Sequence, residues 1–145
     1  MQTRKWKLDT DYKYLVEWWK QYDFGTVPKE CLPPDGIVVL LDRPICAAGL
    51  YLCKGTKFGF MEWVVVDKKI GLKTAHNALN LCIGEIIQMA KDNNIKLLYT
   101  VTAQEALQKR YTKYHGMEIG EKSSMTFVKD LSNKEYKDLD FVKDA

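Results

Sequence analysis

One carboxylate, Glu62, lies inside an apolar run that extends from Phe58 to Asp67. The run is rich in aromatic and β-branched residues, which favour a β-strand that is buried on both faces. A carboxylate in such a strand is partly removed from water, and desolvation raises its pKa toward neutrality. A group of this kind can act as a general base for an amine that must lose a proton. Glu62 is therefore a candidate catalytic base, and an ion-paired or edge-facing glutamate without a catalytic role is the alternative.

A short basic loop with a glycine follows this run and leads into a long helical segment. The loop carries Lys68, Lys69, Gly71 and Lys73, and the helix is expected over Thr74–Asn94. The first turn of a helix presents unpaired N–H groups and the positive end of the helix dipole, which stabilise an anion. The sequence therefore predicts a phosphate-binding site between the strand and the helix.

Three elements must hold these groups in place. Within residues 74–94 apolar residues recur at helical spacing, and β-branched residues return in the run 95–102. A strand, a helix and a strand in about 45 residues form a βαβ unit, whose two strands lie parallel. Strict alternation along the first strand predicts one face with Phe60, Glu62 and Val64 and another with Met61, Trp63 and Val65.

The chain before this unit predicts further strands and a helix. We expect a strand over 2–8, a helix capped by Asp9 or Thr10 that reaches Tyr22, a long loop over 23–36, and strands over 37–41 and 45–53. Tight turns join the last two strands to the strand that carries Glu62, so these three form an antiparallel meander. Small residues at 47–49 permit close approach of a ligand or of a packed helix.

The first helix has more aromatic residues than one buried stripe requires. The predicted stripe contains Tyr12, Leu15, Val16, Trp19 and Tyr22. Tyr14 and Trp18 are four residues apart and fall on another face, toward solvent. We expect this pair either to line an acceptor site or to pack beneath the following loop.

The last predicted helix extends over residues 103–115 and carries Tyr111 on its apolar stripe, which indicates a core aromatic. His115 and Gly116 suit a helix C-terminus, where a cationic ring complements the dipole and glycine the left-handed cap. His76 lies near the start of the central helix, where a surface position beside a phosphate and a catalytic role are both open. Residues 118–129 predict two closing strands, and residues 132–145 a short C-terminal helix or a tail.

The composition indicates one globular domain. A chain of 145 residues with 46% hydrophobic and 28% charged residues can bury a core of its own. Its net charge of +3 permits an anionic or nucleic-acid partner but requires neither, because basic and acidic residues are interspersed. The absence of a signal peptide and of an apolar run near 18 residues, roughly the length of a membrane span, indicates a reducing cytosol.

The four cysteines form no C-x-x-C pair and have no cluster of histidines beside them, so no metal site is expected. Cys46, Cys53 and Cys82 lie in apolar runs, where a thiol behaves as a small hydrophobic group.

The order of these elements resembles the GCN5-related N-acetyltransferase (GNAT) superfamily over residues 1–131. The phosphate loop of that family reads Gln/Arg-x-x-Gly-x-Gly/Ala, and this chain has Lys68-x-x-Gly71-x-Lys73. The glycine matches, Lys68 keeps a positive charge, and Lys73 replaces the small last residue. The chain is also similar to short GNAT-like proteins of bacteriophages, which share the Trp18-Trp19 pair, a proline-rich loop and a Glu-Trp in the fourth strand.

The resemblance implies an α+β fold with a mixed sheet, helices on both faces, and acetyl-CoA as the acyl donor. It assigns the binding of pantetheine and phosphates to Val64, Val65, Val66, Lys68, Lys69, Gly71, Lys73 and Thr74. Glu62 would be the base, and the long loop with Tyr14 and Trp18 would meet the acceptor. In the family a tyrosine four residues before the terminal glycine protonates the departing thiolate; that position is Thr112, and Tyr111 is one residue away.

The resemblance thus predicts an acyl-CoA-dependent N-acyltransferase for a small-molecule or protein amine. Lys73 and the displaced Tyr111 favour an alternative, a degenerate GNAT fold that acts as a binding protein or a phage anti-defence factor in the host cytoplasm. A third candidate is a DNA base-modifying protein of the Mom type, in which Tyr14, Trp18 and Trp19 stack a base, although the chain has no continuous basic stripe. No membrane partner is expected, and a homodimer is left open.

Overall fold

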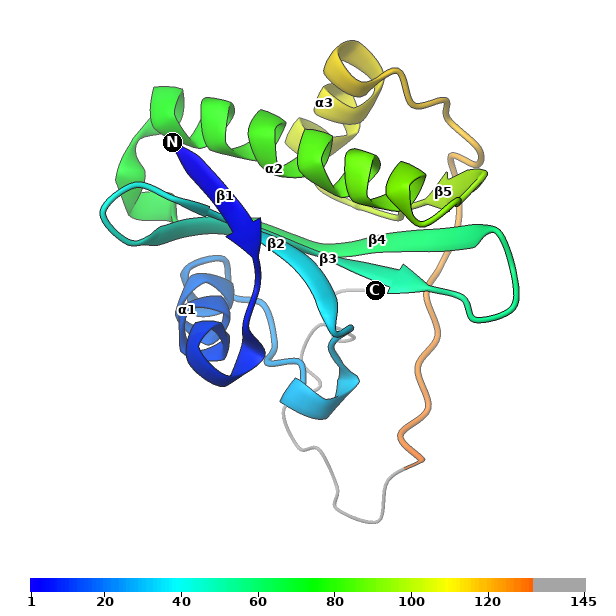
Figure 1. Cartoon of the computed structure of the whole chain (residues 1–145), viewed down its shortest axis with the longest axis horizontal. Coiled ribbons are helices and arrows are strands. Elements are labelled where there is room, and N and C mark those ends of the chain that lie inside the picture. Colours follow the sequence, from blue (N-terminus) through cyan, green and yellow to red (C-terminus); the bar gives the residue numbers. More distant parts are fainter. Residues whose placement is uncertain (132–145) are drawn as a thin grey trace.

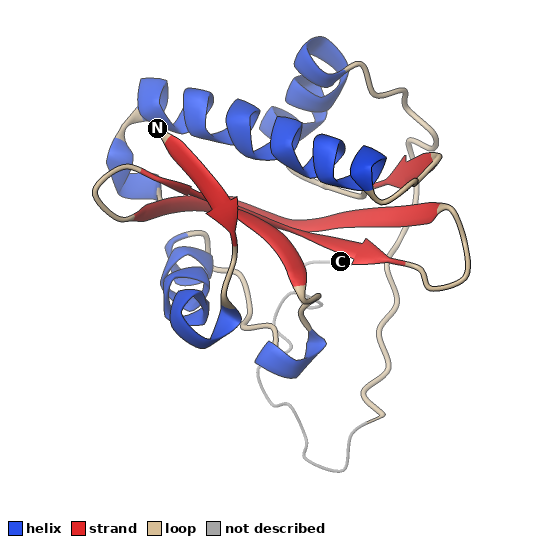
Figure 2. Cartoon of the chain, in the orientation of Figure 1, coloured by secondary structure: helices blue, strands red, loops and turns tan. Residues whose placement is uncertain are grey.

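The computed structural model describes residues 1–131. In chain order the elements are β1 (Gln2–Lys5), α1 (Leu8–Gln21), the 3-10 helix η1 (Lys29–Cys31), β2 (Asp35–Leu40), β3 (Pro44–Leu52), β4 (Phe58–Val66), the 3-10 helix η2 (Lys68–Ile70), α2 (Leu72–Asp92), β5 (Leu97–Tyr99) and α3 (Glu105–His115). Within these residues the strands form one five-stranded sheet in the order β1-β2-β3-β4-β5. Helix α1 covers one face, and α2 and α3 lie on the other (Figures 1 and 2). The predicted α+β architecture is confirmed.

The connectivity of the sheet agrees with the sequence patterns. Strands β1 to β4 are antiparallel to their neighbours, and β5 pairs parallel with β4 after the crossover through α2. The parallel ladder is short, from the pair Phe58 and Leu97 to the pair Phe60 and Tyr99. Strand β5 therefore has three residues where eight were predicted, and β4 separates from the chain that follows β5.

Strand β4 does not alternate as predicted, because it contains a bulge. The pairing with β3 shifts between Ala47 and Gly49, and Trp63 has φ of +62°, which is rare for a bulky residue. Beyond the bulge the faces are exchanged. Met61 and Val64 pack in the core on the α2 side, whereas Trp63 packs on the α1 side. The expectation that Met61 and Trp63 share a face is therefore wrong.

Two apolar cores lie on the two faces of the sheet. Helix α2 packs Ala78, Cys82, Ile83 and Ile86 on residues of β2, β3 and β4. Helix α1 packs Leu15, Trp18 and Trp19 with Trp6 on the other face. A Cβ atom at Gly36 of β2 or at Gly49 of β3 would overlap the Trp6 ring, so Gly49 accommodates a core indole. Ala47 and Ala48 are buried in the cores on the α1 side and the α2 side, respectively.

The α1 helix differs from its prediction at its cap and along its stripe. It begins at Leu8, and the carboxylate of Asp11 accepts the Lys7 N–H at 2.7 Å and pairs with Arg4 at 2.7 Å. Capping by Asp9 or Thr10 is therefore wrong. Leu15 and Trp19 are buried as predicted, but Tyr12, Val16 and Tyr22 are only half-buried. Trp18 is buried as well, because the loop residues Val27 and Leu32 cover that side of the helix.

The chain after α3 lacks the predicted closing strands. Residues 116–131 contain no strand, and their apolar side chains Ile119, Met125 and Phe127 are exposed. The predicted C-terminal helix or tail over 132–145 lies outside the described residues. Sheet growth therefore stops at β5 within the part of the chain that the structure describes.

Candidate active site

A pocket of about 320 Å³ opens where β4 and the chain after β5 diverge. Its walls come from the end of α1, the following loop, the bulge of β4, the segment after β5, and α3. The lining residues include Trp19, Asp23, Phe24, Gly25, Val27, Glu62, Trp63, Val64, Thr100, Val101, Thr102, Leu107 and Tyr111. The pocket therefore joins the two candidate catalytic residues with the loop that was expected to meet the acceptor.

Glu62 lies at the bulge and is half-buried in the wall of the pocket. Burial raises the pKa of its carboxyl group to about 7, and a long hydrogen bond of 3.4 Å from the Val101 N–H lowers it only in part. No cation among residues 1–131 pairs with this carboxylate. The predicted desolvation is confirmed, and the ion-paired alternative has no partner in that part of the chain.

Tyr111 points into the same pocket from α3 and is 5% exposed. Burial raises its pKa well above the usual range, although a hydrogen bond with the Thr100 side chain opposes the shift and the nearby Glu62 adds to it. Thr100 in turn donates to the Met61 carbonyl at 2.7 Å. The neighbouring Thr112 is exposed and bonds back to its own helix. The chain thus brings Tyr111, and not Thr112, to the pocket.

The end of α3 fixes this placement. Gly116 adopts a left-handed conformation with φ of +63°, and its N–H and that of Met117 bind the Tyr111 carbonyl. The predicted glycine cap is confirmed. Burial and then Arg110 lower the pKa of His115 below its ordinary value, which disfavours the cationic ring expected at this helix end.

The edge of β4 offers backbone groups to the pocket. The Asp67 N–H donates to the Ile45 carbonyl at 2.8 Å, so alternation of an antiparallel ladder directs the backbone of Val65 toward β3. The N–H and carbonyl groups of Val64 and Val66 then face the other edge. Tyr22 Oη donates to the Val66 carbonyl at 2.9 Å and so occupies one of them. Val65 cannot contribute backbone contacts at this edge, and its side chain is buried against α1.

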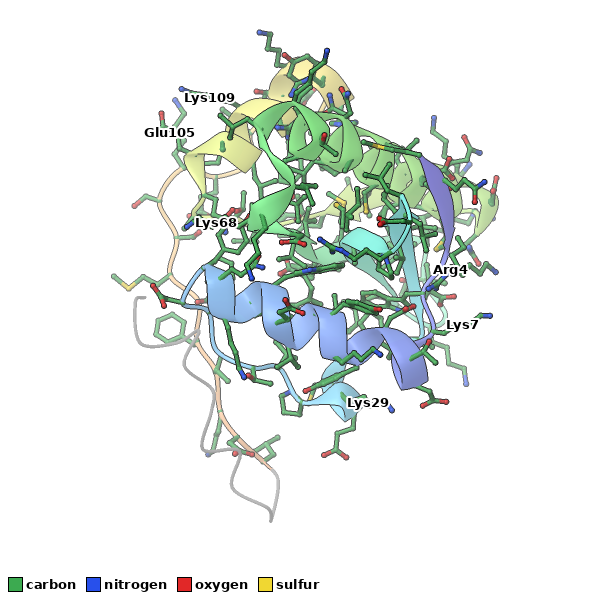
Figure 3. The ribbon with its side chains drawn as sticks, turned by 90° about the vertical axis from the view of Figure 1, so that its left-hand side faces the viewer. Arg4, Lys7, Lys29, Lys68, Glu105 and Lys109 are labelled. Carbon is green, nitrogen blue, oxygen red and sulfur yellow. The ribbon has the colours of Figure 1, made fainter. Side chains whose placement is uncertain are left out.

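Two N–H groups of the predicted phosphate loop are already occupied. The Gln21 side-chain oxygen accepts the Lys68 N–H at 2.8 Å, and the Asp67 carboxylate accepts the Lys69 N–H at 3.0 Å. Gln21 also donates to Asp67 at 3.0 Å, so the end of α1 holds the loop through both side chains. Figure 3 shows Lys68 beside the end of α1, where its ammonium lies 5.5 Å from the Tyr22 ring centroid. The expectation that the Lys68 and Lys69 amides are free for a phosphate is wrong.

The N–H groups in the first turn of α2 have no hydrogen-bond partner among residues 1–131. Gly71 has φ of +86°, a conformation that favours glycine, and a Cβ there would meet no atom within 4 Å. The first helical bond is from the Ala75 N–H to the Gly71 carbonyl, and no side chain caps the helix. The amides of residues 72–74 therefore remain for an anion. Gly71, Lys73 and Thr74 stay candidate phosphate contacts.

The aromatic pair Tyr14 and Trp18 does not reach the pocket. Trp18 is 1% exposed, and Tyr14 packs on it with ring centroids 6.0 Å apart. The solvent-facing position expected for Trp18 is wrong, and the alternative, packing beneath the following loop, is what the structure has. Trp19 is 2% exposed, so neither indole offers a face on which a base could stack.

Pattern reasoning missed three contributors to the pocket. Phe24 and Asp23 lie in the loop after α1, and Trp63 was assigned to a core face. The available signal was an aromatic residue in a glycine- and proline-containing loop, where no core stripe requires one. The positive φ of Asp23, +56°, and of Trp63 could not be read from residue type.

His76 does not line the pocket. Its Nδ1 lies 3.1 Å from Arg110 Nη1, and the same Arg110 atom donates to the Asn80 side-chain oxygen at 2.8 Å. His115 Nε2 lies 3.3 Å from that oxygen. This polar cluster joins α2 to α3 outside the pocket. Its role is therefore to position α3, which carries Tyr111.

The cysteines and the remaining surfaces add no further chemistry to the site. Cys46 and Cys82 are buried as expected of small hydrophobic groups, whereas Cys53 is exposed, contrary to expectation. Among residues 1–131 no three His, Cys, Asp or Glu side chains come together in a way that could hold a metal ion. In the same part of the chain, no helix combines the length and apolar character needed to cross a membrane.

Comparison with known proteins identifies the fold. No protein-family model matches the chain, and no curated protein matches it in sequence. Solved structures do match. A Mycobacterium tuberculosis protein in complex with CoA and NLQ has a TM-score of 0.64 at 17% identity over 89% of this chain and 76% of that one. Glucosamine-6-phosphate N-acetyltransferase from Arabidopsis thaliana has a TM-score of 0.59 at 14% identity over 90% of this chain and 98% of that one.

A third match is an aminoglycoside acetyltransferase from an uncultured soil metagenomic sample, in complex with sisomicin. Its TM-score is 0.61 at 10% identity over 90% of this chain and 96% of that one. The chain therefore has the GNAT acetyltransferase fold. At these identities the likeness establishes the fold alone, so activity has to be argued from the pocket.

Proposed function

We propose that the chain is an N-acyltransferase that transfers an acetyl group from acetyl-CoA to an amine. The observation that carries the proposal is that Glu62 and Tyr111 line one pocket, in which Glu62 has a pKa of about 7 while the raised pKa of Tyr111 keeps its phenol protonated. Two titratable groups whose environments separate their protonation states are suited to act as base and acid.

Glu62 is suited to the role of base. With a pKa of about 7, a large part of the carboxyl group is ionised at neutral pH and can still take up a proton. An amine in the pocket, directly or through one water molecule, would give its proton to Glu62 before it attacks a thioester. Among residues 1–131 no cationic side chain pairs with the Glu62 carboxylate, so no salt bridge there competes with its protonation.

Tyr111 is suited to the role of acid. Its raised pKa keeps the phenol protonated throughout the pH range of the reaction. Thr100, whose side chain interacts with the phenol, is itself anchored to β4 through the Met61 carbonyl. A departing thiolate near this phenol would take its proton.

The acyl donor would be held by backbone groups. Acetyl-CoA supplies the activated acetyl group when it binds. The backbone groups of Val64 and the N–H of Val66, for which the described part of the chain shows no partner at this edge, suit a pantetheine arm that adds to β4 as a strand would. The amides of residues 72–74, with the Lys73 ammonium, suit a pyrophosphate at the start of α2. The M. tuberculosis structure of the same fold contains CoA, which supports this choice of donor.

Isothermal titration of acetyl-CoA tests the donor site. Lys73→Glu reverses a charge at the start of α2 and is expected to weaken binding by about tenfold or more. Lys54→Glu makes the same change on the exposed turn between β3 and β4 and should leave affinity unchanged. If both variants lost the same affinity for acetyl-CoA, the effect would come from net charge and not from the start of α2. If the wild type did not bind acetyl-CoA, the proposed donor site would be contradicted.

The occupied groups around the donor site favour a second candidate, a GNAT fold that serves as a non-catalytic binding protein. Gln21 and Asp67 take two loop amides, and Tyr22 takes the Val66 carbonyl, so less of the backbone is left for a coenzyme. Recovery of a tight macromolecular partner by a protein that binds no coenzyme would favour this candidate. The similarity to phage-encoded proteins and the cytosolic location stay predictions.

A further inference from the structure

We propose that the amine acceptor is an organic cation with an aromatic or apolar body and no anionic substituent. The inference rests on the proposed function, because it names the class of amine that the same pocket would accept. It is carried by the charges and by the ring surfaces that line the pocket.

Among residues 1–131, the charged side chains that line the pocket are all of one sign. They are Asp23 and Glu62, and both are acidic. Two basic side chains of neighbouring elements are engaged elsewhere: Lys68 lies over the Tyr22 ring, and Arg110 contacts His76 and Asn80. A ligand carboxylate or phosphate would meet two acidic groups and no cation, whereas an ammonium would be attracted.

Aromatic rings supply the complementary surface for such a cation. Phe24 is 38% exposed, and Trp63 is half-buried at the bulge. Trp63 Nε1 donates to Tyr51 Oη at 2.9 Å, and its ring meets Trp19 in an edge arrangement with centroids 6.4 Å apart. These contacts hold the indole in place before a ligand binds. An exposed aromatic ring beside carboxylates, here that of Phe24, stabilises an ammonium through its π face and packs on an apolar body.

Backbone strain marks one of these residues. Among residues 1–131, three non-glycine residues have positive φ: Asp23, Trp63 and Asn94. Asp23 and Asn94 directly follow the ends of α1 and α2, where a residue commonly adopts this conformation. Trp63 lies inside β4 and lines the pocket, and a bulky residue rarely has a positive φ. Strained conformations of this kind concentrate at binding and catalytic sites, which is consistent with a pocket that Trp63 helps to shape for a ligand.

A matched pair of ligands tests the inference. Tryptamine and tryptophan share the indole and a primary amine, but tryptophan adds a carboxylate. Isothermal titration into the full chain, with and without saturating coenzyme A, is expected to give tryptamine an affinity about tenfold or more above that of tryptophan. Butylamine, which lacks the ring, should also bind more weakly than tryptamine. Equal affinities for tryptamine and tryptophan, or no binding by either, would overturn the inference.

A matched pair of variants locates the effect in the pocket. Asp23→Asn removes one charge and keeps a residue that tolerates positive φ, so it should reduce the affinity for tryptamine about fivefold while the affinity for tryptophan stays or rises. Asp42→Asn makes the same change in net charge in the exposed β2–β3 turn, outside the pocket. The inference is wrong if both variants change tryptamine binding equally.

The titrations also separate this inference from the proposed function. If the protein prefers tryptamine but binds no coenzyme, the inferred class of ligand is upheld and the proposed acetyltransferase function is contradicted. Coenzyme binding together with a preference for glucosamine-6-phosphate over glucosamine would uphold a donor site and overturn the cationic acceptor.

Discussion

Glu62 and Tyr111 owe their opposed roles to the same cause, which is burial in one pocket. Burial penalises the charged form of each group, so the pKa of both is raised. Because a carboxyl group starts near pH 4 and a phenol near pH 10, roughly, the same penalty brings Glu62 to neutrality and removes Tyr111 from the titration range. Which of the two groups acts as base and which as acid is therefore decided by residue type, because both groups share one environment.

This burial has a consequence for stability. The folded protein holds a proton on Glu62 up to a pKa of about 7, above the ordinary value of 4.5, so the folded state binds a proton that the unfolded chain releases. Stability from this group is complete below pH 4.5 and is lost as the pH rises through 7. Glu62→Gln cannot ionise, so it should exceed the wild type in free energy of unfolding by about 3 kcal/mol at pH 8 and match it near pH 4.

Urea unfolding at the two pH values measures this difference. Glu17→Gln, on the exposed side of α1, is the control and should show no pH-dependent gain. If Glu62→Gln followed the wild-type pH dependence, the carboxyl group would not be desolvated in the folded protein.

At the scale of elements, the local patterns predicted the meander, the parallel strand pair and the glycine cap, because each depends on neighbouring residues. The bulge of β4 was not predictable, since it depends on how Trp63 fits between α1 and β3. The burial of Trp18 likewise depends on a loop that folds over a second face of its helix. The candidate base and its desolvation could be predicted from one strand, whereas Asp23, Phe24 and Trp63 meet only in the fold.

Two glycines test the packing of these elements. A Cβ at Gly36 would overlap the Trp6 ring, so Gly36→Ala should lower the free energy of unfolding by about 1–3 kcal/mol. Gly84, inside α2, faces open space, and Gly84→Ala should raise it by about 0.5–1 kcal/mol through helix propensity. Denaturant unfolding of both variants checks the pair. A tolerated alanine at Gly36 would mean that Trp6 does not occupy the space between β1, β2 and β3.

At the scale of the molecule, the sheet and its two cores hold a pocket between elements that are distant in sequence. Helix α1 reaches this site twice, with Trp19 in the pocket wall and with Gln21 on the loop before α2. The acceptor side and the donor side are thereby tied to one helix. Asp67 and Tyr22 already occupy backbone groups of the proposed donor site. Binding of the coenzyme therefore has to be measured by titration before transfer is assayed.

Formation of N-acetyltryptamine tests the central claim most directly. We would follow it by mass spectrometry from acetyl-CoA and tryptamine with the wild type, Glu62→Gln, Tyr111→Phe and the control Thr112→Ala. The wild type should form product with a rate that rises through pH 7, and Thr112→Ala should equal it. Glu62→Gln should lose about a hundredfold and its pH dependence, and Tyr111→Phe about tenfold or more. A wild type that binds acetyl-CoA and tryptamine without forming product, or a Glu62→Gln variant as fast as the wild type, would contradict the account.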